Sequence, residues 1–425
     1  MALAGDVGKL YPHESAGVQV SLCSKSASQR TSRPLGDDLR VLVLAGIAPS
    51  TVFSHVPLAM ALRNSGHQVM VTASLDDMIP TIAGVGLPAI RTTDPDLGPR
   101  EIFARDSRLL EIPEDPVARE QQSGHWYGRL EAVTLDALVA FAEDWPPDVI
   151  IGGMGSYAAP LLAKRLGVPH VRHGWDIHDP HLVDLGATEE LQPELAELGL
   201  SEIPEPDMTI DITPPSLRLP DAAPAQTMRW IPGNTQCLLE PWMYKRGADT
   251  RIGVTIGTGV ARYNQYDFLQ AIVENISIPD AEVVVPITED SLPGLRDRLK
   301  NVLAGWIPLD IVAPTCDVLV HQSGGSTMMT ALSFGVPQVL IPDPALHRAN
   351  EMARRIVEAG AGIMLTPEEA TSDVLAKSCQ EIVSNPKHAA AARSLAREIA
   401  ALPLPSEVAR RIEWLVHTEP ARRRD

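Results

Sequence analysis

The chain of 425 residues is too long for one typical hydrophobic core and long enough for two α/β domains. Hydrophobic residues make up 44% and charged residues 21%, as is usual for a globular protein, and no apolar run reaches the roughly 18 residues that a membrane span needs. The net charge of −18 repels nucleic acids and anionic membrane surfaces, so neither is an expected partner.

Residues 1–38 show no periodic pattern and no apolar stretch of the kind that a secretory signal carries, so we expect an irregular N-terminal tail. The four cysteines show neither metal-ligand spacing nor a disulfide framework; they are Cys23, Cys237, Cys316 and Cys379. Both observations favour a reducing compartment, and we expect a cytoplasmic protein.

The first regular pattern is an apolar run at 39–44, which predicts a buried strand. A loop at 45–50 follows, and then apolar residues recur at helical spacing until Gly66 ends the helix. A second apolar strand at 68–73 completes a βαβ unit, the seed of a parallel sheet.

The same alternation returns further along, as a strand at 148–151, a helix at 157–166 and a strand at 169–172. Between them, the stretch 74–147 is only weakly periodic and rich in Pro, Asp and Arg. Long loops at the carboxyl ends of parallel strands usually carry binding sites, so we expect a ligand to meet this stretch.

A proline-rich stretch at 212–232 is the best candidate for a linker, because βα alternation starts again after it. The sequence therefore predicts two Rossmann-like, doubly wound parallel-sheet domains that face each other across a cleft. In residue numbers, we expect a tail at 1–38, a first domain at 39–215, a linker at 216–236, a second domain at 237–404 and a C-terminal helix and tail at 405–425.

The segment 321–327 carries the clearest chemical signal, because it follows an apolar strand and opens a helix. Small residues here let backbone N–H groups approach an anion, and a helix N-terminus adds partial positive charge. Hydroxyl or ring N–H donors are available as well, so a diphosphate is the expected guest of His321, Gly324, Gly325, Ser326 and Thr327. A tight structural turn is the alternative interpretation.

The run from Trp306 to Asn350, with Gly335-Val336-Pro337-Gln338 inside it, resembles the donor-binding segment of the antibiotic and macrolide glycosyltransferases of the GT-B fold. Leu58-Ala59 with Gly66-His67, and the segment 155–172, are also similar to that family. The likeness extends over roughly residues 39–415, and its C-terminal part is the more specific.

The resemblance implies that the first domain binds the acceptor and the second the nucleotide sugar. Trp306 and Ile307 would line the nucleobase pocket, and Thr258 would lie near the phosphates. It also implies inverting displacement at the anomeric carbon with no redox cofactor and no metal ion, the helix dipole and His321 stabilising the leaving nucleotide.

One departure concerns the general base, which in the family is a histidine in the loop after the first strand. The corresponding position here is Thr51, which cannot act as a base near neutral pH. His55, one helical turn further on, and Asp176, in an expected cleft loop, are candidates for the missing base. An acceptor that is itself acidic would relax the demand for a base, and loss of catalysis is the remaining explanation.

A second departure lies at Leu346-His347, where relatives that use fully hydroxylated sugars carry an acidic residue and Gln. Leu346 cannot accept hydrogen bonds from a sugar, which favours a deoxysugar, typically carried on thymidine diphosphate (TDP). Asp343 and His347 would supply the polar contacts at this edge, unless the register of the comparison is shifted.

The resulting hypothesis is a transferase of antibiotic biosynthesis, which moves a deoxysugar from a nucleotide donor, with TDP favoured, to a hydrophobic polyketide-type aglycone. The alternatives are a catalytically silent relative that binds a nucleotide sugar or a partner protein, and a nucleotide-sugar epimerase. The resemblance leaves open whether an activator protein or a homodimer is required.

Overall fold

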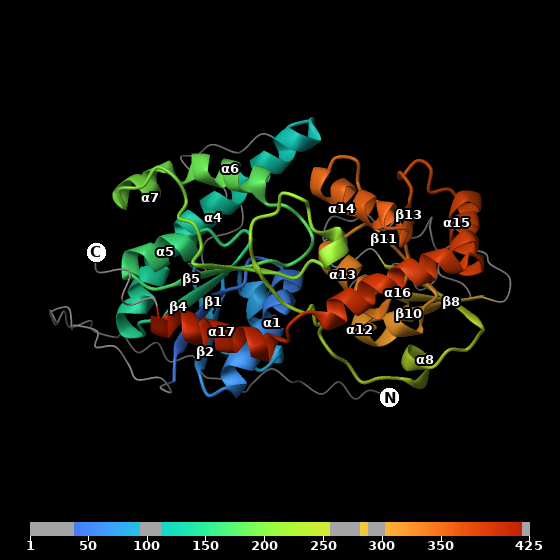
Figure 1. Ribbon diagram of the computed structural model, residues 1–425, viewed down its shortest axis with the longest axis horizontal. Coiled ribbons are helices and arrows are strands. Elements are labelled where there is room, and N and C mark those ends of the chain that lie inside the picture. The colour runs from blue at the N-terminus through green and yellow to red at the C-terminus, as the bar shows by residue number, and fades with distance from the viewer. Residues whose placement is uncertain (1–37, 94–111, 256–280, 288–301, 419–425) are drawn as a thin grey trace, which may run out of the picture.

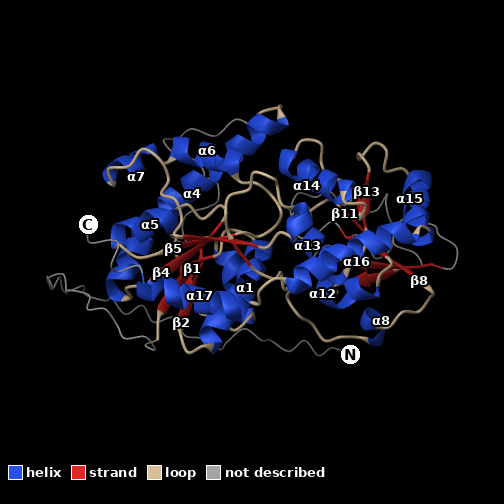
Figure 2. Ribbon diagram, in the orientation of Figure 1, coloured by secondary structure: helices blue, strands red, loops and turns tan. Residues whose placement is uncertain are grey.

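The computed structural model describes residues 38–93, 112–255, 281–287 and 302–418, which form two α/β units side by side (Figures 1 and 2). The first unit has a seven-stranded sheet in the order β3-β2-β1-β4-β5-β6-β7, and the second a six-stranded sheet in the order β10-β9-β8-β11-β12-β13. Every neighbouring pair of strands is parallel. The predicted pair of doubly wound parallel-sheet units is therefore confirmed.

The two central strands of the first sheet, β1 and β4, are apolar runs that are buried on both faces. Such burial is expected for parallel strands that helices cover on both sides. The strands of this sheet are β1 (Arg40–Leu44), β2 (Gln68–Ala73), β3 (Ala89–Arg91), β4 (Val149–Gly153), β5 (His170–His173), β6 (Met208–Asp211) and β7 (Gln226–Thr227). Its helices are α1 (Pro49–Asn64), α2 (Ile79–Gly84), α4 (Pro116–Asp144), α5 (Ala158–Leu166), α6 (His181–Glu190) and α7 (Gln192–Glu197).

The second unit repeats the plan around a fully buried β11. Its strands are β8 (Thr250–Thr255), β9 (Ala281–Pro286), β10 (Leu303–Gly305), β11 (Val318–His321), β12 (Gln338–Leu340) and β13 (Gly362–Met364). Its helices are α8 (Pro241–Tyr244), α12 (Leu309–Val312), α13 (Gly325–Phe334), α14 (His347–Glu358), α15 (Ser372–Ser384) and α16 (Pro386–Ala401). Short 3-10 helices cover Asp76–Met78, Pro215–Leu217 and Ala313–Thr315.

The longest described helix, α4, lies in the stretch that the sequence predicted as loops. Its buried face holds polar side chains, among them Glu120, Arg129 and Glu131, and also Gly124 and Gly128. An apolar 3.6-residue period is therefore diluted, which explains why periodicity missed this helix. None of the helices within the described ranges is long and apolar enough to cross a bilayer.

The chain returns to the first unit at its C-terminal end. Helix α17 (Pro405–Thr418) packs on α1, and Glu413 Oε1 lies 2.9 Å from His67 Nε2. Inside the proline-rich connection, β7 adds an edge strand next to β6. The two units are therefore joined by two crossings of the chain, one before β8 and one before α17 (Figure 1).

Candidate functional site

The loop between β11 and α13 is shaped by His321, which is almost fully buried at the end of β11. Its Nε2 lies 2.7 Å from Gln338 Oε1 and its Nδ1 accepts the Ser323 N–H at 3.1 Å. Burial lowers the pKa of His321 to about 4, against the opposing effect of the Gln338 hydrogen bond. The ring is therefore neutral, and both of its nitrogens are hydrogen-bonded to other groups of the protein. Its predicted contact with a diphosphate stays a prediction.

Ser323 is the one non-glycine residue with positive φ among the residues that the structure describes, at φ 64°. It is 1% exposed, and its Oγ has no hydrogen-bond partner in that part of the chain. A side chain in the left-handed region costs about 1–2 kcal/mol. Backbone strain of this kind is concentrated in functional loops. Because serine rarely adopts a positive φ, no local sequence pattern predicts the strain at Ser323.

The N-terminus of α13 is free of any capping side chain and has no acidic residue in its first turn. The first bond within the helix runs from Met328 N–H to the Gly324 carbonyl, so the preceding amides have no partner in the helix. Ser326 and Thr327 lie at this end and line a pocket. Unpaired amides together with hydroxyl donors make this helix start suitable for a phosphate group.

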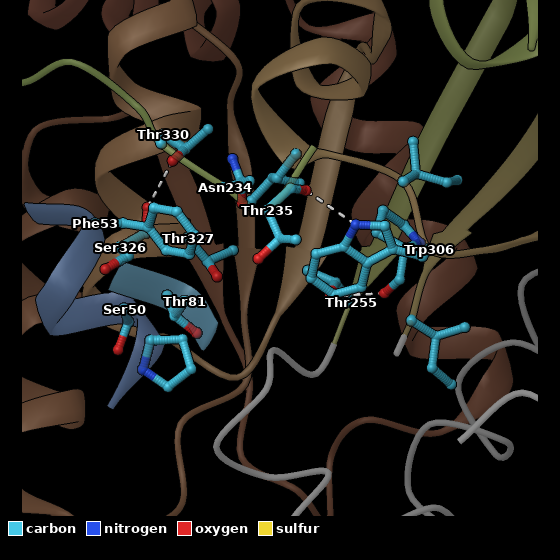
Figure 3. Close-up of a pocket in the computed structure, with 16 residues that line it drawn as sticks. Ser50, Phe53, Thr81, Asn234, Thr235, Thr255, Trp306, Ser326, Thr327 and Thr330 are labelled. Atoms are coloured by element: carbon cyan, nitrogen blue, oxygen red, sulfur yellow. Dashed lines mark hydrogen bonds between the residues drawn. The ribbon is translucent and has the colours of Figure 1, made fainter. Parts of the chain in front are cut away.

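That pocket has a volume of about 270 Å³ and lies between the two units (Figure 3). Residues from the first unit, the connection and the second unit line it: Pro49, Ser50, Phe53, Thr81, Gly233, Asn234, Thr235, Thr255, Pro286, Ile287, Trp306, Ile307, Leu309, Ser326, Thr327 and Thr330. The structure therefore brings four predicted donor residues together, Trp306 and Ile307 on one side and Ser326 and Thr327 on the other. Thr258 lies outside the described residues.

The connecting segment contributes Gly233, Asn234 and Thr235 to this pocket, which was not predicted from the sequence. Trp306 Nε1 donates to the Thr235 carbonyl at 3.0 Å (Figure 3). Asn234 Nδ2 donates to Asp310 Oδ1 at 2.9 Å. These bonds fasten the connection beside the indole. A polar Asn-Thr pair at the end of a proline-rich stretch was the available signal.

Thr51 caps the helix on which it lies rather than facing the pocket. Its Oγ1 accepts the N–H of the N-cap residue Ala48 at 3.3 Å and donates to the Ala48 carbonyl at 2.8 Å, and a Cβ added at Gly46 would lie 3.0 Å from that oxygen. On the same helix, Ser50 and Phe53 do line the pocket. The position at which the family carries its histidine is therefore occupied by a helix-capping hydroxyl.

His55 is buried one turn deeper, with its ring 4.7 Å from that of His173. Its Nδ1 lies 2.7 Å from the Thr51 carbonyl, which fixes the proton on Nδ1 and leaves a lone pair on Nε2. That Nε2 has no hydrogen-bond partner in the described structure. Burial lowers the pKa of His55 to about 4, although the Thr51 carbonyl opposes the shift.

Asp176 has both carboxylate oxygens engaged: Oδ1 accepts the His178 N–H at 2.9 Å, and Oδ2 pairs with Arg348 from the second unit. A Cβ added at Gly325 would lie 2.7 Å from the Asp176 Cβ, so Gly325 leaves room for this contact between the units.

Asp343 and His347 do not line the pocket. His347 is the first residue of α14, and Asp343 lies in the turn before it, where its Oδ1 accepts the Ala345 N–H.

A metal site is not evident in the described parts of the chain, where no group of three or more His, Cys, Asp or Glu side chains could hold an ion. The polar groups of the pocket are hydroxyls, amides and backbone N–H groups. This donor set suits a nucleotide and its phosphates.

Comparison with known proteins agrees with the fold. Residues 60–257 match the N-terminal domain, and residues 270–415 the C-terminal domain, of the family described as Erythromycin biosynthesis protein CIII-like. The chain is 33% identical to the L-demethylnoviosyl transferase of Streptomyces niveus, covering 87% of this chain and 97% of that one. It is 29% identical to the 3-alpha-mycarosylerythronolide B desosaminyl transferase of Saccharopolyspora erythraea over 87% of this chain and 96% of the relative.

Among solved structures, the glycosyltransferase SsfS6 of Streptomyces sp. SF2575, complexed with thymidine diphosphate, superposes with a TM-score of 0.78 at 35% identity. The superposition covers 88% of this chain and 99% of that one. The family match extends over both units, and both solved and curated relatives are named glycosyltransferases. The chain therefore belongs to the Erythromycin biosynthesis protein CIII-like family and is a glycosyltransferase that uses a nucleotide-activated sugar.

Proposed function

We propose that the enzyme transfers a deoxysugar from a TDP donor to a polyketide-type natural-product aglycone, with inversion at the anomeric carbon. The pocket between the two units carries this proposal, because it joins an indole, two hydroxyls and an uncapped helix N-terminus in one cavity. The thymine would stack at Trp306, and the diphosphate would lie against Ser326, Thr327 and the first amides of α13.

The names of the relatives support both the donor and the acceptor. Curated relatives include a 2-deoxy-L-fucose transferase of Streptomyces galilaeus and a 10-deoxymethynolide desosaminyltransferase of Streptomyces venezuelae. The spinosyn rhamnosyltransferase SpnG, 27% identical to this chain, was solved once with thymidine diphosphate and once with spinosyn aglycone. None of the three described cysteines is in a disulfide, which fits a reducing compartment, and we propose that the reaction takes place in the cytoplasm.

We propose His55 as the proton acceptor. Its Nδ1–H is oriented by the Thr51 carbonyl, and its Nε2 has no partner among the described residues, as a general base requires. The ring is buried and does not line the pocket, so the proposal requires the acceptor hydroxyl to reach in to Nε2. A pKa of about 4 keeps the ring unprotonated at neutral pH but makes it a weak base. A weak base suits an acidic acceptor, so a phenolic hydroxyl of the aglycone is the acceptor that this site favours.

The test is release of TDP from a panel of TDP-deoxysugars in the presence of phenolic and alcoholic polyketide aglycones. Turnover with phenolic acceptors is expected, and His55→Gln should lower kcat about a hundredfold or more, as loss of a general base does. His388→Gln is the matched control, because His388 is a half-buried histidine on α16 that bonds to the Gly360 carbonyl. Binding of TDP without turnover on any acceptor would instead favour a silent relative.

A further inference from the structure

The beginning of α14 is a helix start that its own sequence leaves incomplete. Its N-cap residue is Leu346, no side chain of the segment caps it, and its first turn contains no acidic residue. Arg348 in that first turn has the charge that a helix N-terminus disfavours. Unless another part of the chain supplies an acceptor and a negative charge, this helix start is poorly stabilised.

The missing cap comes from α4 of the other unit. Glu120 Oε2 accepts the Arg348 backbone N–H at 2.7 Å, and His178 Nε2 lies 2.6 Å from Glu120 Oε1. Burial raises the pKa of Glu120, but the hydrogen bond and charge of His178 and the contacts with Arg348 lower it more, so the net shift is downward. The cap is therefore an anion placed at a helix N-terminus.

Residues 175–178, after β5, bring a second set of contacts to α14. Asp176 pairs with the Arg348 side chain, whose guanidinium carbon lies 5.8 Å from the centre of the Trp175 ring. Two helical turns later, Arg355 donates to the Ile177 carbonyl. Asp176 also lies against Gly325 at the start of α13. The same short segment thus contacts the start of α13 and two positions on α14.

We propose that Glu120 and Asp176 are positioning residues, which complete the beginning of α14 from the opposite unit and thereby hold its first residues in place against the donor sugar. This inference rests on the proposed function, because it assumes that the sugar lies beside Asp343 and His347. The pocket lined by Trp306, Ser326 and Thr327 contains no residue of α14. The contact of Glu120 with α14 therefore affects the sugar end of the site more than the nucleotide end.

The test compares Glu120→Gln and Asp176→Asn with Asp136→Asn, an equal change of charge at an exposed position of α4. Hydrogen–deuterium exchange of the peptide covering the first turn of α14 is measured first, since it does not depend on activity. Glutamine keeps an oxygen that can accept the Arg348 N–H and lacks only the negative charge. Exchange there should therefore speed up by about twofold to fivefold in Glu120→Gln, with no change in the control.

The second readout separates the sugar end from the nucleotide end. In both variants the KM for the TDP-sugar should rise and kcat should fall, by about twofold to fivefold in kcat/KM. In Glu120→Gln, whose side chain does not line the pocket, the Kd for TDP alone should stay within about twofold. Glu120→Ala, which removes the acceptor altogether, should give the larger effect, about threefold to thirtyfold.

Exchange and kinetics equal to the control would overturn the proposal. So would tighter TDP binding in Asp176→Asn, which would make Asp176 a competitor of the phosphates. Failure of the wild-type protein to bind TDP would instead count against the proposed function, and the exchange measurement would still decide whether Glu120 completes α14.

Discussion

Replacing Ser323 with glycine should make the protein more stable, because two unfavourable features of the donor loop disappear together. The backbone at φ 64° costs a side chain about 1–2 kcal/mol and costs glycine nothing. The Oγ is buried without a partner, which adds about 1–3 kcal/mol. Against this, glycine makes the unfolded chain more flexible, at a cost of about 0.4–1 kcal/mol.

The net expectation is a gain of about 1–4.5 kcal/mol, or roughly 2–18 °C in the melting temperature of a unit of this size. Thermal unfolding followed by circular dichroism measures the shift. Ser323→Ala separates the two causes, because alanine removes the hydroxyl and keeps the backbone strain, so it should recover only part of the gain. A lower melting temperature in Ser323→Gly than in the wild type would refute the reasoning.

Three further predictions concern the core. Arg251→Met should destabilise the second unit by about 3–5 kcal/mol in urea unfolding, because the fully buried guanidinium pairs with Glu282 at 2.5 Å; a loss under about 1 kcal/mol would contradict this. Gly124→Ala should lower the melting temperature of the first unit, because the added Cβ would lie 2.0 Å from a backbone oxygen of α6. Gly84→Ala is the control, because a Cβ at that position meets no atom within 4 Å. Burial lowers the pKa of His55 to about 4, so the folded protein keeps this ring neutral, and the free energy of unfolding should fall as the pH drops from about 6.5 towards 4. His55→Gln should make the free energy of unfolding depend less steeply on pH in this range. An unchanged pH dependence would contradict the assigned burial.

The sheets were predictable because their strands are short apolar runs next to glycine or proline stops. The run at 39–44 became β1, and the strand before the donor loop became β11. Burial on both faces makes such runs visible in the sequence without any knowledge of their neighbours. Helix boundaries were less exact: α1 begins at Pro49, inside the expected loop, since proline suits the first turn of a helix.

The form of the segment 321–327 was predictable for a similar reason, because its signal is local: a strand end, small residues and a helix start follow one another directly. Its contact with a diphosphate stays a prediction. The contacts between the units were not. Glu120 and Arg348 are 228 positions apart, and a buried glutamate on a helix has no periodic signature. The role of Asp176 was also invisible, because a carboxylate that pairs with a distant arginine looks the same in sequence as one that accepts a proton.

The measurement that tests the central claim most directly is calorimetric titration of the protein with TDP, comparing the wild type with Thr327→Val. Ser333→Ala is the matched control, because Ser333 also lies on α13 but does not line the pocket, and its hydroxyl bonds to the Thr330 carbonyl. If the pocket beside Trp306 holds the nucleotide, Thr327→Val should weaken TDP binding about tenfold to a hundredfold, the value of a hydrogen bond to a charged group, while the control binds like the wild type. Equal affinity in all three proteins would place the nucleotide elsewhere and contradict the account.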